Sequence, residues 1–362
     1  MNKILLIGPF PKPISGVSLA NKVVKEILDD SKDYKVDFIN TSYPVFEDAV
    51  GSFSFKKILF FLNINFNVFK VFKNNIIYLT PGQTFFGITK YFSFILLSSL
   101  LRKELIIHVH GNYLGTQYSQ LSFLKKNIFY FLLSKFTKGI VLSKSLIKNL
   151  TPFLKPERIF ILNNFAQDYL YNSNTEKKTT ALRICYLSNL MEEKGIIYLL
   201  DTLEALEKNN VSYKAKIAGN IDESLTELIL NKINKLKHTI YLGVVYKEDK
   251  KKLLNWSTIF ILPTFYKMEG QPIAILEALA TGNVIISTKH AGIPDIIEDK
   301  INGFLIPTKS TDSLLNALVF LDKNKLVTSK ISIHNKIYFN KNFTINIFKK
   351  EFLKIIAKKC KN

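Results

Sequence analysis

Two glutamates near position 270 have the residue type and spacing that could do chemistry. Glu269 stands in the loop 269–272 (Glu-Gly-Gln-Pro), and Glu277 follows eight residues later in the apolar segment 273–280. On a helix, eight residues place two carboxylates about 80° apart around the axis and at most about 12 Å apart along it. Paired carboxylates of glycoside hydrolases stand roughly 5 to 9.5 Å apart. We therefore expect two separate roles, with a capping acid at Glu269 and a solvated helix residue at Glu277 as the alternative.

The segment 258–288 contains the elements that would hold these glutamates. Its apolar runs 258–263 and 284–286 are typical of buried parallel strands. Pro is favoured at the first position of a helix and Gly just past the last, so Pro272 and Gly282 predict a short helix between the strands. The segment therefore predicts a βαβ unit with a glutamate at its mouth.

The start of this predicted helix is a candidate anion site. The backbone N–H groups of Gly270, Gln271 and Ile273 would gather at the positive end of the helix dipole, where phosphate or pyrophosphate binds readily. Glu269 carries the same sign of charge as a phosphate. We therefore expect Glu269 to accept hydrogen bonds from a neutral polyhydroxy group attached to that phosphate.

A glycine loop and a histidine are the candidate groups in the first half of the chain. Residues 3–7 predict a strand and 17–28 a helix, so Gly16 lies where backbone can approach a ligand closely. Alternation puts His108 and His110 on one face of a predicted strand, with His110 at its carboxyl end, where open α/β sheets bind ligands. Taken alone, a plain turn and a structural histidine are the simpler interpretations.

Apolar runs recur along the chain at spacings typical of doubly wound α/β folds. Further strands are predicted at 35–39, 76–79, 105–109, 139–142, 158–162, 183–187, 216–219 and 240–245. A chain of 362 residues exceeds a usual single core, so we expect two domains. The polar, aperiodic segment 169–181 is the predicted linker between domains 1–168 and 182–340, and a basic amphipathic helix is expected within 341–362.

The formal charge of +21 is concentrated in two zones. Residues 51–150 hold thirteen Lys or Arg against one acid, and residues 323–362 hold eleven Lys against one acid. Within the first zone, the segments 53–73 and 121–138 combine long apolar, aromatic-rich faces with lysines, as in helices that lie in a membrane interface. Because no RNA- or DNA-reading motif accompanies them, we expect contact with an anionic membrane surface and none with nucleic acid. The alternative is that the Phe side chains form a core and the lysines only confer solubility.

Cysteine content and the length of the apolar runs predict the compartment. Two cysteines, Cys185 and Cys360, imply neither a disulfide framework nor a metal cluster and fit a reducing cytoplasm. Residues 1–10 lack the long apolar run of a signal peptide, and the longest apolar stretch, 91–101, is too short to span a bilayer. We therefore expect a cytoplasmic protein that is peripheral on the inner face of the cell membrane.

The region around the two glutamates resembles the donor site of a known enzyme family. The pattern is Glu269-Gly270-x-Pro272, then Leu276-Glu277-Ala278 and Gly282, followed by 292–297 (Gly-Ile-Pro-Asp-Ile-Ile) and 302–305 (Asn-Gly-Phe-Leu). It is similar to the signature of family 4 retaining glycosyltransferases with the GT-B fold, of the bacterial capsule, O-antigen and exopolysaccharide type. The resemblance implies two doubly wound Rossmann-like domains that face each other across a cleft.

The resemblance also implies roles for single residues. His110 would lie beside the transferred sugar, and Gly16 would stand in the loop that faces the donor diphosphate. Glu269 would hold hydroxyls of the sugar, and Glu277 would hold those of the ribose. The predicted strand ends at Gly219 and Val244 would border the nucleotide base.

One departure from the family affects the phosphate site. The family commonly has Gly-Arg-Leu where this chain has Ser188-Asn189-Leu190, although Lys194 and the following glycine are kept. A neutral Asn189 cannot replace the bidentate charge of Arg. Neutralisation of the donor diphosphate would therefore fall on Lys194 and on the helix start at 270–273.

These inferences predict a retaining, metal-independent glycosyltransferase. The second domain would bind a nucleotide-diphosphate sugar, with a UDP-sugar favoured, and the first would bind a glycan or lipid-linked oligosaccharide acceptor, in particular one linked to polyprenyl diphosphate. The absence of an Asp-x-Asp motif is the reason to expect no metal cofactor. The alternatives are a sugar-nucleotide epimerase of the same fold and a catalytically inactive basic protein that binds membrane or nucleic acid.

Overall fold

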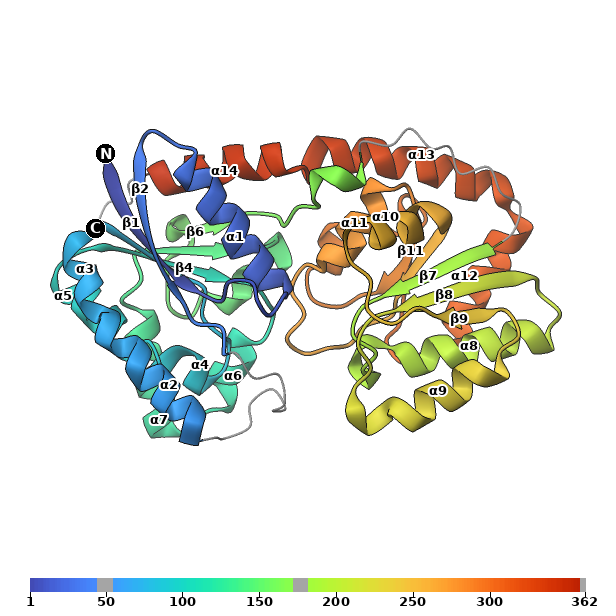
Figure 1. Ribbon diagram of the computed structural model, residues 1–362, viewed down its shortest axis with the longest axis horizontal. Coiled ribbons are helices and arrows are strands. Elements are labelled where there is room, and N and C mark those ends of the chain that lie inside the picture. Colours follow the sequence, from blue (N-terminus) through green and yellow to red (C-terminus); the bar gives the residue numbers. More distant parts are fainter. Residues whose placement is uncertain (44–54, 172–181, 359–362) are drawn as a thin grey trace. The chain divides into compact units, whose positions relative to one another are not determined.

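The computed structural model describes residues 1–43, 55–171 and 182–358 (Figure 1). Most of the predicted linker and Cys360 lie outside these residues. The chain divides into two compact units, one made of residues 1–163 and 349–362 and the other of residues 164–348. Each unit contains one six-stranded sheet in which all neighbouring strands are parallel. The predicted fold class, a doubly wound α/β protein with two sheets, is confirmed.

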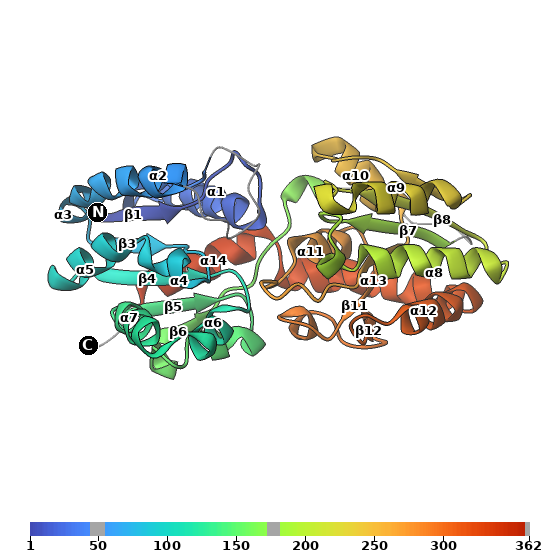
Figure 2. The same ribbon diagram turned by 90° about the horizontal axis from the view of Figure 1, so that it is seen from below.

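The sheet of the first unit has the strand order β2-β1-β3-β4-β5-β6. Figure 2 shows β1, β3, β4, β5 and β6 one below the other. All of its predicted strands are present within one or two residues. The strands are β1 (Asn2–Gly8), β2 (Tyr34–Asn40), β3 (Ile76–Leu79), β4 (Glu104–Val109), β5 (Lys138–Val141) and β6 (Ile159–Ile161).

Helices and short 3-10 turns connect these strands. The predicted helix 17–28 is α1, which begins at Gly16 because the side chain of Ser15 accepts a hydrogen bond from the backbone N–H of Ser18 and caps it. The others are α2 (Phe55–Asn65), η1 (Phe66–Phe69), α3 (Lys70–Lys73), α4 (Phe85–Thr89), α5 (Phe92–Leu100), α6 (Leu114–Gln120), α7 (Phe123–Leu133), η2 (Lys144–Asn149) and η3 (Pro156–Arg158).

The sheet of the second unit has the strand order β12-β11-β10-β7-β8-β9. Its strands are β7 (Leu182–Leu187), β8 (Tyr213–Ala218), β9 (Thr239–Tyr241), β10 (Ile259–Leu262), β11 (Val284–Thr288) and β12 (Gly303–Ile306). The prediction of a strand over 240–245 is wrong beyond Tyr241. The chain turns at Gly243, whose φ of +67° is a left-handed conformation that an extended strand cannot contain.

Helices cover both faces of the second sheet. In Figure 1, α10 (Lys247–Trp256) and α11 (Ile273–Ala280) lie above this sheet, and α8 (Ile196–Lys208) and α9 (Thr226–Lys235) lie below it. The helix α12 (Thr311–Lys323) packs against α8, and α13 (Lys325–Asn342) packs against α11. Short 3-10 turns complete the unit: η4 (Asp168–Leu170), η5 (Glu192–Lys194), η6 (Glu223–Leu225) and η7 (Ile293–Asp295).

The basic helix expected near the C-terminus is α14 (Ile345–Ala357). From Lys349 onward it belongs to the first unit. There Phe352 packs edge-on against Tyr78 of β3, with ring centroids 5.9 Å apart. The buried Lys138 donates from its Nζ to the carbonyl oxygens of Ile355 and Ile356, at 3.0 and 3.1 Å. These carbonyls would otherwise lack partners at a helix end, so Lys138 attaches the end of α14 to the first sheet.

Candidate donor site and histidine cluster

The order of the second sheet creates a switch point between β7 and β10. These two strands are hydrogen-bonded neighbours, but the connections from them lead to opposite sides of the sheet. In open α/β sheets, ligands bind outside the carboxyl ends of strands at such a point. The loop after β7 carries Lys194, and the loop after β10 carries Glu269. The tertiary structure therefore brings two predicted donor-site residues to the place where this fold binds ligands.

Lys194 and Glu269 form a largely buried ion pair. The Lys194 Nζ lies 2.6 Å from Oε2 of Glu269, and the side chains are 15% and 9% exposed. Gly195 makes this approach possible because its φ is +82°, and a Cβ there would lie only 2.4 Å from the carbonyl oxygen of Pro263. The backbone after Lys194 is thus pressed against the end of β10. The Lys194 ammonium group is therefore held in place between the loop after β7 and the loop after β10.

Thr264 is a third member of this cluster. Its hydroxyl lies 3.1 Å from Oε2 of Glu269 and 3.2 Å from the carbonyl oxygen of Glu193, and it can donate to only one of them at a time. No side chain of the described residues caps α11, whose N-cap is Pro272. The alternative of Glu269 as a capping acid is therefore wrong. Its carboxylate orients Lys194 instead.

Glu277 has a partner that the sequence did not indicate. It lies on α11, is buried, and forms an ion pair with Nζ of Lys250 on α10. The hydroxyl of Tyr169 also interacts with Lys250. Burial lowers the pKa of Lys250, but the Glu277 carboxylate and the Tyr169 hydroxyl together more than offset this, so the pKa lies above its usual value. The alternative of a solvated Glu277 is wrong, and the carboxylate stands in a fixed, charge-balanced position.

The predicted anion site at the start of α11 differs from expectation in one detail. Pro272 has ψ 118° and is the N-cap residue, so the helix begins one residue later, at Ile273. The carbonyl oxygen of Gly270 accepts a hydrogen bond from the backbone N–H of Gly292 at 2.9 Å. The side chain of Gln271 is buried, and its Oε1 accepts from the backbone N–H of Asn164 at 2.6 Å. Gln271 therefore holds the loop in shape with its side chain.

The remaining predicted residues of the second unit lie at the ends of β7, β8 and β9. The carbonyl oxygen of Asn189 accepts a hydrogen bond from the Tyr186 hydroxyl at 3.0 Å, while its side chain is exposed. Gly219 has a φ of +144°, and its N–H donates to the carbonyl oxygen of Gly243 at 2.9 Å. Val244 follows this contact and is 48% exposed. The loops after β8 and β9, which were predicted to border the nucleotide base, are thus connected to each other by a backbone hydrogen bond.

In the first unit, the strand order places a switch point between β1 and β3. Asn21 of α1 bridges the two following loops, because its Nδ2 donates to the Pro9 carbonyl oxygen at 2.8 Å and to the Thr80 hydroxyl at 2.7 Å. Gly16 is the first residue of α1, directly after this loop. The arrangement holds the predicted glycine loop at the carboxyl end of the first sheet.

His110 follows β4 and belongs to a cluster of neutral aromatic side chains. Its ring centroid lies 4.0 Å from that of His108, whose Nδ1 shares a hydrogen bond of 2.5 Å with the Tyr78 hydroxyl. Burial lowers the pKa of His110 to about 4, and burial together with His110 lowers that of His108. Among the described residues, Nε2 of His110 has no hydrogen-bond partner. The imidazole is therefore uncharged at neutral pH, and its unpartnered ring nitrogen is buried.

The described residues contain no cluster of three or more His, Cys, Asp or Glu that could hold a metal ion. Lys250, Tyr169 and Thr264 are the site residues that sequence reasoning missed. Lys250 and Glu277 are 27 residues apart in the chain. No local pattern indicates such a pair, since only the order of the strands brings α10 beside α11.

Comparison with known proteins agrees with this geometry. Residues 171–333 match the family model of the glycosyl transferases group 1. The amylovoran biosynthesis glycosyltransferase AmsK of Erwinia amylovora is 29% identical over 151 residues, which are 40% of this chain and 37% of that protein. The UDP-Gal:alpha-D-GlcNAc-diphosphoundecaprenol alpha-1,3-galactosyltransferase of Escherichia coli is 28% identical over 145 residues, 39% of this chain and 36% of that protein. The matched segment spans little more than a third of either relative.

Likeness to solved structures covers almost the whole chain. The crystal structure of Anabaena HepE in complex with UDP superimposes with a TM-score of 0.74 over 98% of this chain and 99% of that chain, at 15% identity. At this identity the likeness concerns the fold. With the strand orders above, it confirms the predicted GT-B fold.

Proposed function

We propose that this chain, whose residues 171–333 belong to the glycosyl transferases group 1 family, moves a sugar from a nucleotide-diphosphate sugar to a glycan acceptor. A UDP-sugar is the favoured donor. The acceptor is a glycan linked to polyprenyl diphosphate, and the transfer retains the configuration of the anomeric carbon. The setting is the synthesis of a bacterial surface polysaccharide on the inner face of the cell membrane.

The Lys194–Glu269 pair at the switch point is the observation that carries this proposal. Departure of a nucleoside diphosphate develops negative charge, and a fixed ammonium stabilises that charge best when no reorganisation is needed. Glu269 holds Lys194 in place before the donor arrives. In this role Lys194 and the start of α11 bind the diphosphate, while Glu269 keeps one oxygen for hydroxyls of the sugar.

The names of similar proteins support the donor and acceptor classes. HepE was crystallised in complex with UDP, and also with UDP-glucose. The name of the Escherichia coli relative specifies a UDP-sugar donor and a diphosphoundecaprenol acceptor. AmsK is named for the synthesis of an exopolysaccharide, amylovoran. These names motivate the choice of UDP and of a polyprenyl-diphosphate acceptor for the first experiments.

His110 is our candidate for the group that contacts the transferred sugar. Its lowered pKa keeps the imidazole neutral at pH 7, so it would exchange hydrogen bonds with the sugar without adding charge. Glu277, fixed by Lys250, is the candidate for the ribose hydroxyls. Neither role involves a metal ion, so we expect transfer to persist in EDTA.

The test starts from a panel of nucleotide sugars. Binding of the correct donor raises the midpoint of thermal unfolding, because the ligand binds only the folded state. The positive nucleotide sugar is then incubated with a lipid-linked acceptor, and the product is analysed for a new glycosidic bond and its anomeric configuration. A nucleotide sugar that is only isomerised would show an epimerase, and the absence of binding and turnover across the panel would refute a glycosyltransferase.

A further inference from the structure

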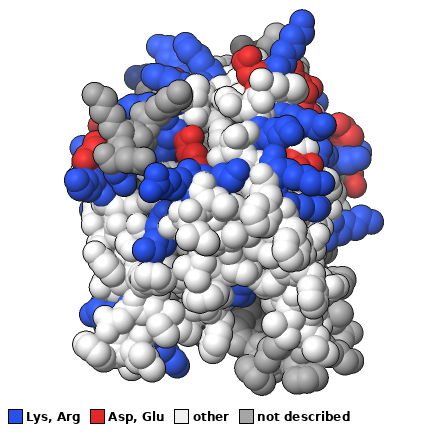
Figure 3. Space-filling view, turned by 90° about the vertical axis from the view of Figure 1, so that its left-hand side faces the viewer, with Lys and Arg blue, Asp and Glu red and all other residues white. Residues whose placement is uncertain are grey.

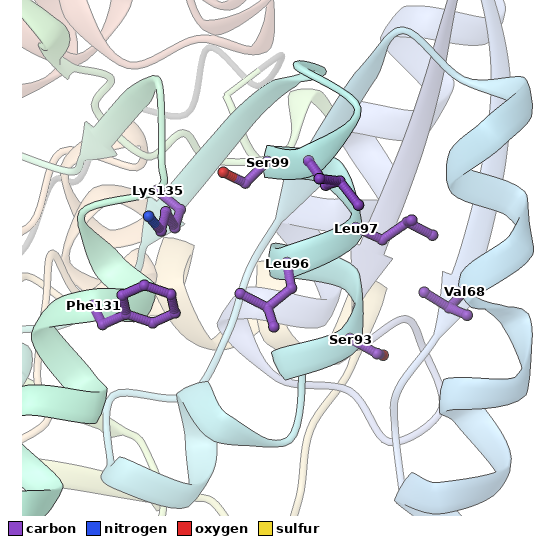
Figure 4. A pocket seen from close by; sticks show the side chains of 8 residues that line it. Val68, Ser93, Leu96, Leu97, Ser99, Phe131 and Lys135 are labelled. Carbon is purple, nitrogen blue, oxygen red and sulfur yellow. The ribbon is translucent and has the colours of Figure 1, made fainter.

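An apolar hollow lies on the first unit, outside the candidate site. It is an open hollow of about 550 Å³, lined mainly by Val68, Leu96, Leu97, Leu100 and Phe131, with Lys135 at its edge. Figure 4 shows Leu96 of α5 and Phe131 of α7 directed toward each other, with Val68 of η1 on the other side of α5. Three elements thus present apolar side chains to one opening.

Six of the nine residues of α5, the helix at the centre of this hollow, are apolar and the other three are serines. Its sequence, 92–100, has no charged residue, yet only Phe94, Ile95 and Ser98 are buried. Leu100, at its end, is 79% exposed. A helix that is mostly apolar and uncharged normally lies in a protein core or in a membrane. Among the described residues, no other element packs over the outer side of α5 and buries it.

The neighbouring elements extend the apolar surface. Phe69 of η1 and Phe72 of α3 stack on each other and are both exposed, and Phe123 at the start of α7 is 83% exposed. Figure 3, which looks at this side of the first unit, shows a broad area with few charged side chains and a border where Lys and Arg gather, with some Asp and Glu among them. A contiguous exposed apolar surface of this kind marks an interaction site.

Basic side chains outnumber acidic ones around the surface, although the Asp37 carboxylate accepts a hydrogen bond from Asn74 at the end of α3. Lys135 lies over the ring of Phe131, 4.3 Å from its centroid, and the Lys103 Nζ lies 3.4 Å from the carbonyl oxygen of Phe72. Glu104 is the one acid in sequence positions 51–150, and it forms an ion pair with the buried Lys138. A partner must therefore offer an apolar interior and a negatively charged surface. A bilayer with anionic headgroups has this chemistry.

We propose that the surface formed by η1, α3, α5 and α7 docks on the anionic leaflet of a membrane, and that the hollow beside α5 receives an acyl chain. Lys103 and Lys135 then meet lipid phosphates at the level of the headgroups. Within the described residues no helix is long and apolar enough to cross a bilayer. The docking surface deepens the proposed function and rests on it for the membrane setting.

The first experiment is flotation of the full chain with vesicles of phosphatidylcholine and about one third phosphatidylglycerol at low salt. We expect the wild type to float, and a Leu100→Glu variant to bind the vesicles at least about tenfold more weakly. The matched control is Leu326→Glu in α13 of the second unit, because Leu326 is also 79% exposed. The control should float like the wild type, and a Lys135→Glu variant should lose binding by a few fold.

The second experiment tests the hollow itself. Fluorescence of a Leu100→Trp variant should be quenched by vesicles with brominated acyl chains, whereas that of a Leu326→Trp variant should not. A wild type that stays at the bottom of the gradient, a Leu100→Glu variant that floats normally, or a Leu100→Trp variant that is not quenched would each overturn the proposal. So would a stable dimer in light scattering that Leu100→Glu dissociates, since a second copy would then be the occupant.

Thermal shift with UDP, measured without vesicles, keeps the two proposals apart. All variants of this surface should keep the UDP-dependent shift of the wild type, because none lies in the second unit's site. A protein that transfers sugar but ignores vesicles would refute the docking surface alone. A protein that binds vesicles but neither binds nor turns over nucleotide sugars would refute the glycosyltransferase alone.

Discussion

Both units build a parallel six-stranded sheet, with different strand orders, and they place different chemistry at the ends of the strands. In the second unit the Lys194–Glu269 pair stands there, and a second pair, Lys250–Glu277, joins helices α10 and α11. In the first unit the corresponding edge carries His110 and His108, which burial keeps uncharged. A shared fold thus does not determine the electrostatics of a site. This difference fits the proposed roles, in which the second unit would bind a diphosphate through fixed charge and the first would contact a sugar through neutral hydrogen-bonding groups.

The outer surfaces of the two units differ as well. The second unit has its helices α8 to α13 on the two faces of its sheet, and most of their apolar side chains are in one core. The first unit leaves apolar side chains of η1, α3, α5 and α7 exposed beside lysines. The second unit also exposes single apolar side chains, such as Leu326 and Ile333 of α13, but only the first unit's exposed set surrounds the apolar hollow that we propose as a docking surface. Four changes in the sites and loops test the contrast in strand-end chemistry.

The largest effect is expected from Lys194→Met in the second unit. Loss of a charge that stabilises the leaving group should lower kcat/KM for transfer by about 100- to 1000-fold. Glu269 would also lose its partner, at a cost of about 3 kcal/mol in the free energy of unfolding. The double variant with Glu269→Gln should recover stability but not activity. Near-normal kinetics of Lys194→Met, alongside an exposed control such as Lys252→Met, would remove Lys194 from the mechanism.

Lys250→Met tests whether the second ion pair also supports the fold. Glu277 is almost fully buried, so leaving it unpaired should cost about 3 kcal/mol in the free energy of unfolding. Combining Lys250→Met with Glu277→Gln should restore most of this loss. Chemical denaturation of the two single variants and the double variant gives the coupling energy directly. Additive losses would show that the pair contributes nothing as a pair.

Gly219→Ala tests the joined loops at the ends of β8 and β9. A Cβ at Gly219 would lie 1.7 Å from the carbonyl oxygen of Ser188, and φ is +144°, so we expect a loss of about 3 kcal/mol. Gly243→Ala is the matched control, because a Cβ at Gly243 would meet no atom of the described residues within 4 Å. Its cost should be about 1 kcal/mol, from the left-handed φ alone. Equal losses in thermal denaturation would contradict the steric argument.

The smallest effect concerns the neutral histidines of the first unit. The pKa of His110 is lowered to about 4 in the folded protein, so below the usual value of 6.5 the unfolded chain binds more protons than the folded one. Stability is therefore fully present above pH 6.5 and falls as the pH drops toward 4. His110→Asn should make the loss between pH 7 and 5 smaller by about 2 kcal/mol. The exposed His334→Asn is the control, and an unchanged pH profile of His110→Asn would contradict a buried neutral imidazole.

Local sequence patterns predicted the helices and strands well, because the formation of these elements depends mainly on residues that are close together in the sequence. The segment 258–288 forms β10, α11 and β11 as expected. Buried strands and a helix bracketed by Pro and Gly can be recognised from the types of a few consecutive residues. The predicted helix 17–28 is α1 for the same reason. The error at 240–245 arose because Val244 and Val245 continue an apolar run through Gly243. Apolar composition cannot show that the backbone has turned there.

The sequence by itself determined the two parallel sheets and the motif around Glu269, because strand periodicity, helix ends and the spacing of motif residues are properties of a contiguous stretch. Only the tertiary structure decided which charges meet. Lys194 reaches Glu269 across 75 residues, Lys250 reaches Glu277 across 27, and Gln271 reaches Asn164 across 107. These partners are chosen by the order of strands and the sides on which helices pack, which are set by the core as a whole. The two glutamates thus begin as unassigned acids in the sequence and become positioned, charge-balanced groups in the fold.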